Sequence, residues 1–291
     1  MASISIPYYA DSTTLPADLP TIDEIEASED VFCDQTGRRA VGVGPHFAVK
    51  NGVRIDLREG ETMLFVQAST SVPVPHIYAL FKDLISAKAY IIMERIPGKD
   101  LESEWSSLSE TQKDAIAIKL KASFDELRGL QSAGAYCSVG KRPLLDNVFW
   151  NGDAADSIAG PFETEAEFNN AMIQKYTFNN LPQKKAGFYQ QALPFVLTDH
   201  PPVFTHGDFQ RKNVGLRNVP CYSDDELVGY EHEIVILDWE FAGWYPSYWE
   251  YSRAIFGCRW DDDWNSWVGK ILDPYLNEWA WMEMLFGELW S

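Results

Sequence analysis

The sequence is poor in basic residues and has no long apolar run. Lysine and arginine number 24 against 43 aspartates and glutamates, so the formal net charge is −19. Such a chain repels the phosphates of nucleic acids and of anionic membranes, and we expect neither partner. A membrane-spanning helix needs about 20 consecutive apolar residues, and none appear. Residues 1–30 lack a basic start followed by an apolar stretch, so no secretory or transit signal is predicted and we expect a cytoplasmic protein.

Cysteine is also sparse. The four cysteines are widely spaced without a C-x-x-C pair, which predicts no zinc site and requires no disulfide. We expect all of them to be buried thiols: Cys33, Cys137, Cys221 and Cys258. Apolar residues make up 46% and aromatic residues 14% of the 291 residues, which is enough for a sizeable core in one large or two smaller domains.

Two polar motifs follow apolar runs in the second half of the chain. The first runs from His206-Gly207-Asp208 to Asn213, and the second is Ile236-Leu237-Asp238. An aspartate and an asparagine separated by four residues fit a phosphotransfer loop, in which the aspartate orients or deprotonates the attacking hydroxyl and the asparagine ligates Mg²⁺. Either tripeptide alone occurs by chance in many chains, but their order and spacing match together. We therefore predict Asp208 as the base, with Asn213 and Asp238 as Mg²⁺ ligands.

On these motifs the chain resembles the aminoglycoside phosphotransferase family, in the broad sense that includes choline-kinase-like enzymes. Three further segments carry the resemblance: Ala48-Val49-Lys50, Val72-Pro73-Val74-Pro75 and Ile92-Met93-Glu94. The resemblance implies an α+β, bilobal protein-kinase-like fold, with an antiparallel sheet and a helix in a small N-terminal lobe and a larger, mainly helical C-terminal lobe. It implies transfer of the γ-phosphate of ATP, with GTP as an alternative, to a hydroxyl of a small molecule with the help of Mg²⁺. We expect a nucleotide-binding lobe at 1–96 and a catalytic, acceptor-binding lobe at 97–291.

The predicted strand Phe47 to Lys50 ends in the cation that we expect to hold the α- and β-phosphates. A lysine at a strand end is more often a solvated terminus, but the Ala-Val-Lys context before a helix favours the phosphate role. In the predicted helix Arg58 to Gln67, Glu59, Met63 and Val66 share one face, so Glu59 points inward. We predict Glu59 as the ion-pair partner of Lys50, with Glu61 as second choice.

The predicted strand Ala89 to Ile96 ends where a kinase-like fold has its hinge. Met93, Glu94 and Ile96 are therefore predicted to contact the nucleotide, mainly through their backbone atoms, although Met93 also fits simple core packing. The segment Asp34 to Pro45 holds three glycines but no G-x-G-x-x-G, so no phosphate-loop residue is assigned.

Local signals place several other elements. Capping-box spacings predict helix starts at Thr21, Ser109 and Thr164. Paired strands are expected at Val31 to Cys33 and Ala40 to Val43. Helical periodicity predicts helices from Pro246 to Phe256 and from Trp264 to Leu289, the second broken by Pro274. Nine of the eleven tryptophans lie at or after Trp239, and we expect them to pack in the core.

The negative charge is compatible with a small, cationic acceptor, although acidity also simply keeps a protein dispersed. Glu240 and the run Asp261-Asp262-Asp263 are candidates for binding an amine, against the simpler interpretation of a solvated turn. The main alternative function is a nucleotide-binding pseudokinase that regulates a partner, which the intact set of site residues disfavours. A protein kinase is a weaker alternative, because His-Arg-Asp, Asp-Phe-Gly and Ala-Pro-Glu are absent. The sequence indicates no oligomeric state.

Overall fold

The computed structural model describes residues 4–152, 158–223 and 226–290, with the backbone alone at 218 and at 221–230 within those ranges. The chain forms two compact units. We call them the sheet unit, Met1–Ser107 with Lys212–Glu240, and the helical unit, Leu108–Arg211 with Phe241–Ser291. The predicted α+β class is confirmed. The expected functional division at residues 96 and 97 stays a prediction; by contact, residues 97–107 and 212–240 group with the sheet unit.

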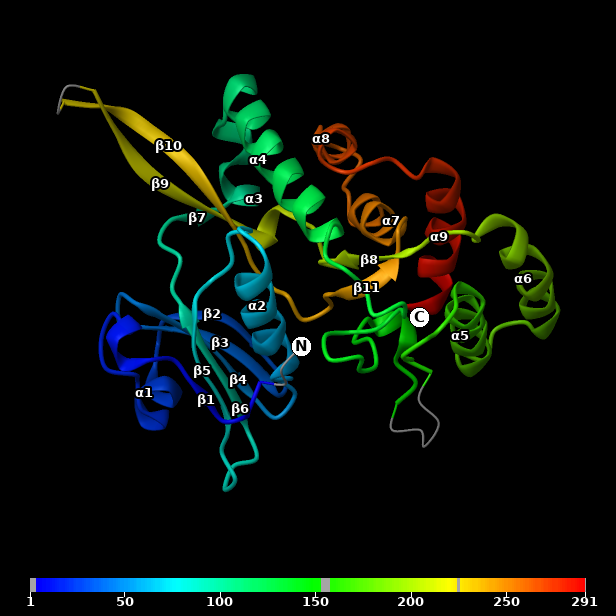
Figure 1. Cartoon of the computed structure of the whole chain (residues 1–291), viewed down its shortest axis with the longest axis horizontal. Helices are drawn as coiled ribbons and strands as arrows, with labels where there is room; N and C mark the ends of the chain where they lie inside the picture. Colours follow the sequence, from blue (N-terminus) through cyan, green and yellow to red (C-terminus); the bar gives the residue numbers. More distant parts are fainter. Residues whose placement is uncertain (1–3, 153–157, 224–225, 291) are drawn as a thin grey trace. The chain divides into compact units, whose positions relative to one another are not determined.

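A six-stranded antiparallel sheet dominates the sheet unit, in the order β1-β5-β6-β4-β3-β2 (Figure 1). Its strands are β1 (Tyr8–Tyr9), β2 (Val31–Gln35), β3 (Arg38–Val43), β4 (Phe47–Gly52), β5 (Ile77–Lys82) and β6 (Ala89–Glu94). The predicted strands at 31–33, 40–43, 47–50 and 89–96 are confirmed, with ends that differ by a few residues. The β2–β3 turn is tight, and Gly37 occupies it with a φ of +80°, a region that glycine enters without strain.

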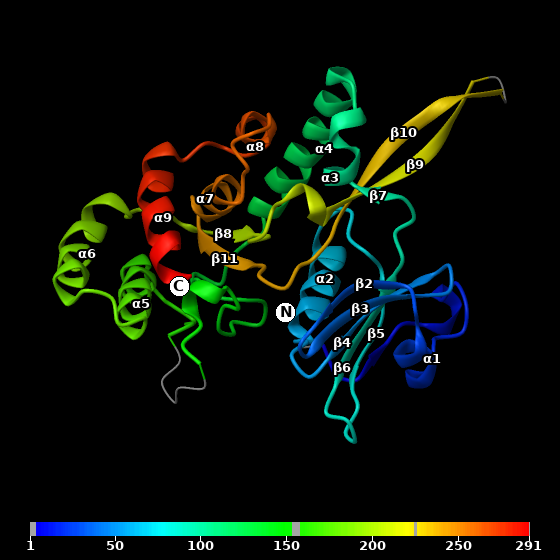
Figure 2. The ribbon, with the colours of Figure 1, turned by 180° about the vertical axis from the view of Figure 1, so that it is seen from behind.

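Helices α1 (Ile22–Ala27) and α2 (Arg58–Ser69) cover opposite faces of this sheet (Figures 1 and 2). Ile25 of α1 packs in a buried cluster with Val49 and Ile92, which are partners in the β4–β6 register. Because side chains alternate along a strand, Lys50 and its partner Ile91 face the other way, toward α2. The capping box predicted at Thr21 is present, with Thr21 Oγ1 accepting from the Glu24 N–H.

A second, three-stranded sheet in the sheet unit has the order β10-β9-β7. Strands β9 (Val214–Ser223) and β10 (Glu226–Ile236) form a long hairpin, and β7 (Lys99–Asp100) pairs with β9 beside α3 (Leu101–Glu104) (Figure 1). The sequence patterns did not predict this hairpin. It places Asn213 and Asp238 in the same unit, because Asn213 precedes β9 and Asp238 follows β10.

The helical unit is built from six α-helices and a two-stranded sheet within the described residues. The helices are α4 (Glu110–Arg128), α5 (Glu165–Phe178), α6 (Gln183–Val196), α7 (Trp249–Phe256), α8 (Trp264–Ile271) and α9 (Leu276–Leu289); the strands are β8 (Pro202–Thr205) and β11 (Gly243–Pro246). The helix starts predicted at Ser109 and Thr164 are confirmed. The helix predicted from Pro246 begins only at Trp249, because Gly243–Pro246 pairs with β8 instead. Helix α6 was not predicted.

Aromatic side chains fill the core of the helical unit. Phe168 and Trp249 are fully buried, and their rings meet edge to face with centroids 5.1 Å apart. The core role expected for the tryptophans holds for Trp249 but not for Trp260, which is 64% exposed. The expectation of buried thiols is confirmed for Cys137 and Cys258 and wrong for Cys33. Cys33 is exposed because it lies on the edge strand β2, where all five residues are exposed. The side chain of Cys221 lies outside the described residues.

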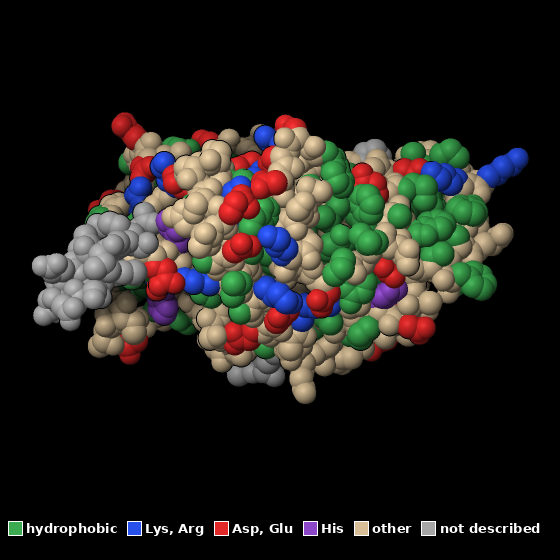
Figure 3. All heavy atoms as spheres, turned by 90° about the horizontal axis from the view of Figure 1, so that it is seen from above, with side chains coloured by type: hydrophobic (Ala, Val, Ile, Leu, Met, Phe, Trp, Pro, Cys, Tyr) green, Lys and Arg blue, Asp and Glu red, His purple; other side chains and the backbone are tan. Residues whose placement is uncertain are grey.

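Two surface properties bear on partners. Within the described residues, no helix combines the length and apolar character that crossing a membrane requires. On the face seen in Figure 3, the described Lys and Arg side chains are scattered among Asp and Glu side chains and form no continuous basic strip.

Candidate active site

Three charged side chains of the sheet unit meet at the Nζ atom of Lys50. This atom lies 2.6 Å from Glu59 Oε1 and 2.6 Å from Asp238 Oδ1. The exposed fraction of the side chain falls from 30% at Asp238 to 19% at Lys50 and 4% at Glu59, so the cluster opens to solvent at Asp238. The ion pair expected between Lys50 and Glu59 is present. Glu61, the second choice, is half-buried on the same helix.

The sheet and α2 bring Lys50 and Glu59 together. Lys50 projects from β4 toward α2, and Glu59 lies on the inner face of α2 with Met63 and Val66, which are 1% and 0% exposed. Gly60 lets the helix approach the sheet closely, since a Cβ atom there would lie 2.1 Å from Leu80 Cδ2. The helical periodicity seen in the sequence therefore describes the side of α2 that faces the site.

Burial and charge act against each other in this cluster. Burial would lower the pKa of Lys50, but the carboxylates of Glu59 and Asp238 outweigh it and the pKa is raised, so the ammonium stays charged. Burial raises the pKa of Glu59 to about 7, opposed by the charge of Lys50 and assisted by that of Asp238. Glu59 therefore depends on Lys50 to remain ionised near neutral pH.

Asp238 and Asn213 lie at neighbouring ends of the β9–β10 hairpin. The Leu237 N–H donates to the Asn213 carbonyl oxygen at 2.8 Å, which ties the two chain segments together. Asp238 has a φ of +65°, a left-handed conformation that costs free energy for most residues and is better tolerated by aspartate. Unusual backbone conformations of this kind concentrate at functional sites. Both residues present oxygen atoms, the ligand type that Mg²⁺ prefers.

The predicted hinge residues lie at the end of β6. The Arg95 N–H donates to the His46 carbonyl at 2.9 Å, so Phe47 and Glu94, which lie opposite each other, form a non-hydrogen-bonded pair of the β4–β6 ladder. The backbone N–H and carbonyl groups of Glu94 therefore point away from β4. The Glu94 N–H then donates to the His76 carbonyl at 2.7 Å. Met93 is 9% exposed and shares the Lys50 face of the sheet by strand alternation. Ile96 is half-buried. The contacts of these three residues with a nucleotide stay predictions.

Asp208 belongs to the helical unit, in the loop after β8. Its carboxylate accepts a hydrogen bond from Gln210 Nε2 at 2.6 Å, and its N–H donates to His206 Nδ1 at 3.3 Å. Gly207 has a φ of +85°, and a Cβ atom there would lie 2.9 Å from the Phe241 carbonyl oxygen, so glycine is needed for the turn. The loop thus fixes the position of the Asp208 backbone.

Helix α7 anchors this loop through residues that the sequence analysis missed. Glu250, 2% exposed, accepts from the His206 N–H at 2.5 Å and from the Gly207 N–H at 3.2 Å. Burial raises its pKa, and the charge of His206 and these N–H donors oppose the rise. Arg253 Nε donates to the Gly207 carbonyl at 3.3 Å and lies 3.5 Å from the buried Asp146 Oδ2. The available signal was a glutamate and an arginine three residues apart, the two charged residues of a helix that is mostly apolar and aromatic.

The residues considered for amine binding have partners inside their own units. Glu240 Oε2 lies 2.7 Å from Arg38 Nη1 in the sheet unit. In the helical unit, Asp262 pairs with Arg211, which follows the Asp208 loop, and Asp263 lies 2.9 Å from Lys113 Nζ. Most of the acid run therefore has a structural use.

Comparison with known proteins identifies the family. The chain matches the profile of the phosphotransferase enzyme family over residues 54–285. This range includes helix α2, which carries Glu59, and both polar motifs. The chain belongs to this family. The resemblance to aminoglycoside phosphotransferases stated from the motifs is therefore confirmed at the family level. The comparison with curated protein sequences finds no match.

Solved phosphotransferases share the fold. Aminoglycoside phosphotransferase APH(4)-Ia is 15% identical with a TM-score of 0.55, over 92% of this chain and 85% of that one. APH(2″)-IIa, solved as a ternary complex with streptomycin and ATP, is 15% identical with a TM-score of 0.53, over 92% and 82%. Aminoglycoside 2′-phosphotransferase-IIIa, solved with GDP, is 14% identical with a TM-score of 0.55, over 89% and 83%. These similarities confirm the kinase-like fold of this phosphotransferase.

Proposed function

We propose that this phosphotransferase is an ATP- and Mg²⁺-dependent kinase that transfers the γ-phosphate to a hydroxyl group of a small molecule. The observation that carries the proposal is the buried cation Lys50, held 2.6 Å from each of Glu59 and Asp238. Phosphoryl transfer needs charge compensation around the triphosphate more than covalent chemistry from the protein. Lys50 is fixed by the buried carboxylate of Glu59 and faces the more exposed carboxylate of Asp238. It would therefore supply a cation beside the proposed Mg²⁺ ligand.

Nucleotide use is supported by the neighbouring structures and by the sheet unit. APH(2″)-IIa binds ATP and the 2′-phosphotransferase-IIIa binds GDP in the solved complexes. We assign the α- and β-phosphates to Lys50 and the adenine to the backbone of Glu94 and Ile96, with Met93 beside the ring. ATP is the proposed donor, and GTP is an alternative that the backbone-mediated contact allows.

The oxygen ligands fit Mg²⁺. Asp238 offers a partly exposed carboxylate and Asn213 an amide oxygen, next to the link between Leu237 and Asn213. The described residues contain no group of three or more His, Cys, Asp or Glu side chains suited to a metal, which excludes a cage made only of such side chains there. Mg²⁺ usually takes one or two protein oxygens and completes its shell with phosphates and water. When bound, it would neutralise charge on the triphosphate.

Asp208 is the proposed base. It would accept the proton of the acceptor hydroxyl as that oxygen forms a bond to the γ-phosphorus, while the bond to the β–γ bridging oxygen breaks and ADP leaves. Gln210 Nε2, 2.6 Å from Asp208 Oδ1, would hold the carboxylate in one orientation. The backbone anchors from Glu250 would keep the loop in place.

The acceptor is proposed to be a small molecule, and the net charge of −19 favours a cationic one. The solved structure of APH(2″)-IIa, which contains streptomycin, supports a small molecule as the class of acceptor. A cytoplasmic location is proposed as well.

Nucleotide binding tests the first half of the proposal. Isothermal calorimetry with ATP and with GTP, each with and without Mg²⁺, should show binding that depends on the metal in the wild type. Asp238→Asn should lose that dependence, whereas Glu283→Gln, an exposed position on α9, should retain it. Equal Mg·ATP affinity in the wild type and Asp238→Asn would remove Asp238 from the metal site. Binding without transfer to any acceptor would favour the regulatory pseudokinase.

A further inference from the structure

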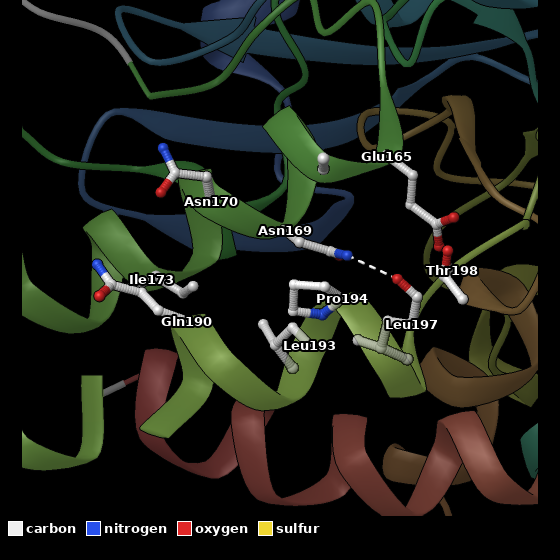
Figure 4. A pocket seen from close by; sticks show the side chains of 10 residues that line it. Glu165, Asn169, Asn170, Ile173, Gln190, Leu193, Pro194, Leu197 and Thr198 are labelled. Atoms are coloured by element: carbon white, nitrogen blue, oxygen red, sulfur yellow. Dashed lines mark hydrogen bonds between the residues drawn. The ribbon is translucent and has the colours of Figure 1, made fainter. Parts of the chain in front are cut away.

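The helical unit contains a cavity that the proposed reaction does not use. It has a volume of about 280 Å³ and lies between α5, α6 and the segment that follows α6 (Figure 4). None of its lining residues belongs to the loop from His206 to Asn213. Its size is close to the lower end of small-molecule sites, which hold about 300–1,000 Å³.

The lining combines an apolar wall with uncharged polar groups and one acidic side chain. Ile173, Leu193 and Pro194 supply apolar surface, and Figure 4 shows Leu193 and Pro194 on the α6 side of the cavity. No lysine or arginine lines it, and Glu165 is the one acidic residue among the lining residues. A phosphate or carboxylate ligand would meet no cation there. The charge of the lining therefore favours a cation over an anion.

Two hydrogen-bond acceptors in this wall lack their usual donors. Pro194 lies inside α6 and has no N–H, so the Gln190 carbonyl cannot receive the helical hydrogen bond from residue 194. Asn169, 5% exposed, donates from Nδ2 to the Leu197 carbonyl at 2.8 Å, which fixes the orientation of the amide, and its Oδ1 has no hydrogen-bond partner among the described residues. Both residues line the cavity. The side chains of Asn170, Gln190 and Thr198, also in the lining, can donate or accept, so a ligand that donates hydrogen bonds would supply partners for these two acceptors.

The negative charge around Glu165 also favours a cationic ligand. Glu165 Oε1 lies 2.8 Å from His200 Nδ1, and Glu278 Oε1 lies 3.4 Å from His200 Nε2. Two carboxylates thus share one imidazole, and the group keeps a net negative charge whether His200 is protonated or neutral. All three side chains are at least four-fifths buried, where charge is poorly screened.

We propose that this cavity binds a small aliphatic amine, with its ammonium group at Glu165 and its carbon chain against Ile173, Leu193 and Pro194. An ammonium offers three hydrogen-bond donors and one positive charge, which match the acceptors and the charge of the lining. The site is independent of the proposed kinase reaction, because neither Asp208 nor any residue assigned to nucleotide or metal takes part in it.

The probe is 1,4-diaminobutane, with 1,4-butanediol as the uncharged counterpart. Calorimetry at physiological ionic strength, which screens non-specific attraction to the acidic surface, gives the affinity. Saturable 1:1 binding of the diamine is expected in the wild type. Glu165→Gln, which removes the charge and keeps the shape, should weaken it by about tenfold or more, the effect of losing one charge-assisted hydrogen bond. The diol should bind to neither protein.

Two further variants separate this site from general attraction. Ala166→Trp places a large side chain at an exposed lining position of α5, so it should fold and block the cavity. Glu167→Gln removes the same charge two residues further along α5, at an exposed residue outside the lining, and should bind like the wild type. Absence of saturable binding in the wild type, or equal affinity in all four proteins, would overturn the proposal. Binding lost in Ala166→Trp but kept in Glu165→Gln would overturn the assignment of an amine.

Discussion

Replacing Lys50 by methionine should destabilise the sheet unit in a way that depends on pH. Methionine keeps much of the side-chain volume but leaves Glu59, which is 4% exposed, without its cation. Removing one partner of a buried ion pair costs about 3–5 kcal/mol, and we expect about 3 kcal/mol because Lys50 is 19% exposed. For a chain of this size that corresponds to a fall of about 6–12 °C in melting temperature at pH 8, without nucleotide or metal.

The pH dependence follows from the pKa of Glu59. Its folded value of about 7 lies above the ordinary value of 4.5, so the folded protein binds the proton more tightly. The contribution of Glu59 to stability therefore falls as pH rises from 4.5 through 7. Without Lys50 the folded pKa rises further, and the fall continues to higher pH. The destabilisation caused by Lys50→Met should thus be smallest near pH 5 and grow above pH 7.

The double variant Lys50→Met/Glu59→Gln is the control. It has no carboxyl group at residue 59, so its loss of stability relative to the wild type should not show the growth above pH 7. Melting followed by circular dichroism across the pH range measures both variants. A loss of stability in Lys50→Met that stays constant with pH, or that grows equally in the double variant, would refute the assignment of a buried, lysine-dependent carboxylate at residue 59.

Three other outcomes are expected. Asp208→Asn should lower kcat by about 10²–10⁴-fold, the usual contribution of a general base, with little change in ATP affinity; steady-state kinetics would expose an unchanged kcat. Glu250→Ala should lower the free energy of unfolding by about 2 kcal/mol or more, because the His206 and Gly207 N–H groups lose their acceptor in a buried place; denaturant unfolding measures this, and a neutral result would contradict the anchoring role. Burial lowers the pKa of His200, but its hydrogen bonds and ion pairs with Glu165 and Glu278 outweigh it and the pKa is raised, with the rings of Tyr248 and Tyr275 beside it. The stability that His200 contributes is therefore present below pH 6.5 and is lost as the pH rises through the folded pKa. His200→Gln should then be more destabilising at pH 6 than at pH 9. Melting curves that show the reverse order would mean that the imidazole is not the charged partner.

Local sequence signals predicted the parts of the fold that local interactions determine. The capping box at Thr21 and the inward face of Glu59 each depend on residues within about two helical turns. The pairing of Lys50 with Asp238 joins residues 188 positions apart, and no periodicity of the sequence predicts it. It could be expected only from the family resemblance, which assigned both residues to one nucleotide site.

Other features were beyond sequence patterns because tertiary packing decides them. Helix α6 contains Gly187 and Pro194, which weaken a helical pattern, yet its buried Tyr189 and Leu193 hold it in the core. The residues at Gly243–Pro246 form a strand because β8 offers them a partner. The left-handed backbone of Asp238 and the anchoring of the Asp208 loop by Glu250 depend on tertiary contacts, and no short sequence motif predicts either of them.

Transfer of labelled phosphate from ATP to a small molecule would show whether this protein is a kinase. The wild type and Asp208→Asn would each be incubated with γ-labelled Mg·ATP and a small-metabolite extract that includes cationic, hydroxyl-bearing compounds, and the products separated. We expect a labelled metabolite that forms with the wild type and not with Asp208→Asn. Equal labelling by both proteins would contradict the role of Asp208, and no labelling by a wild type that binds Mg·ATP would contradict the proposed kinase.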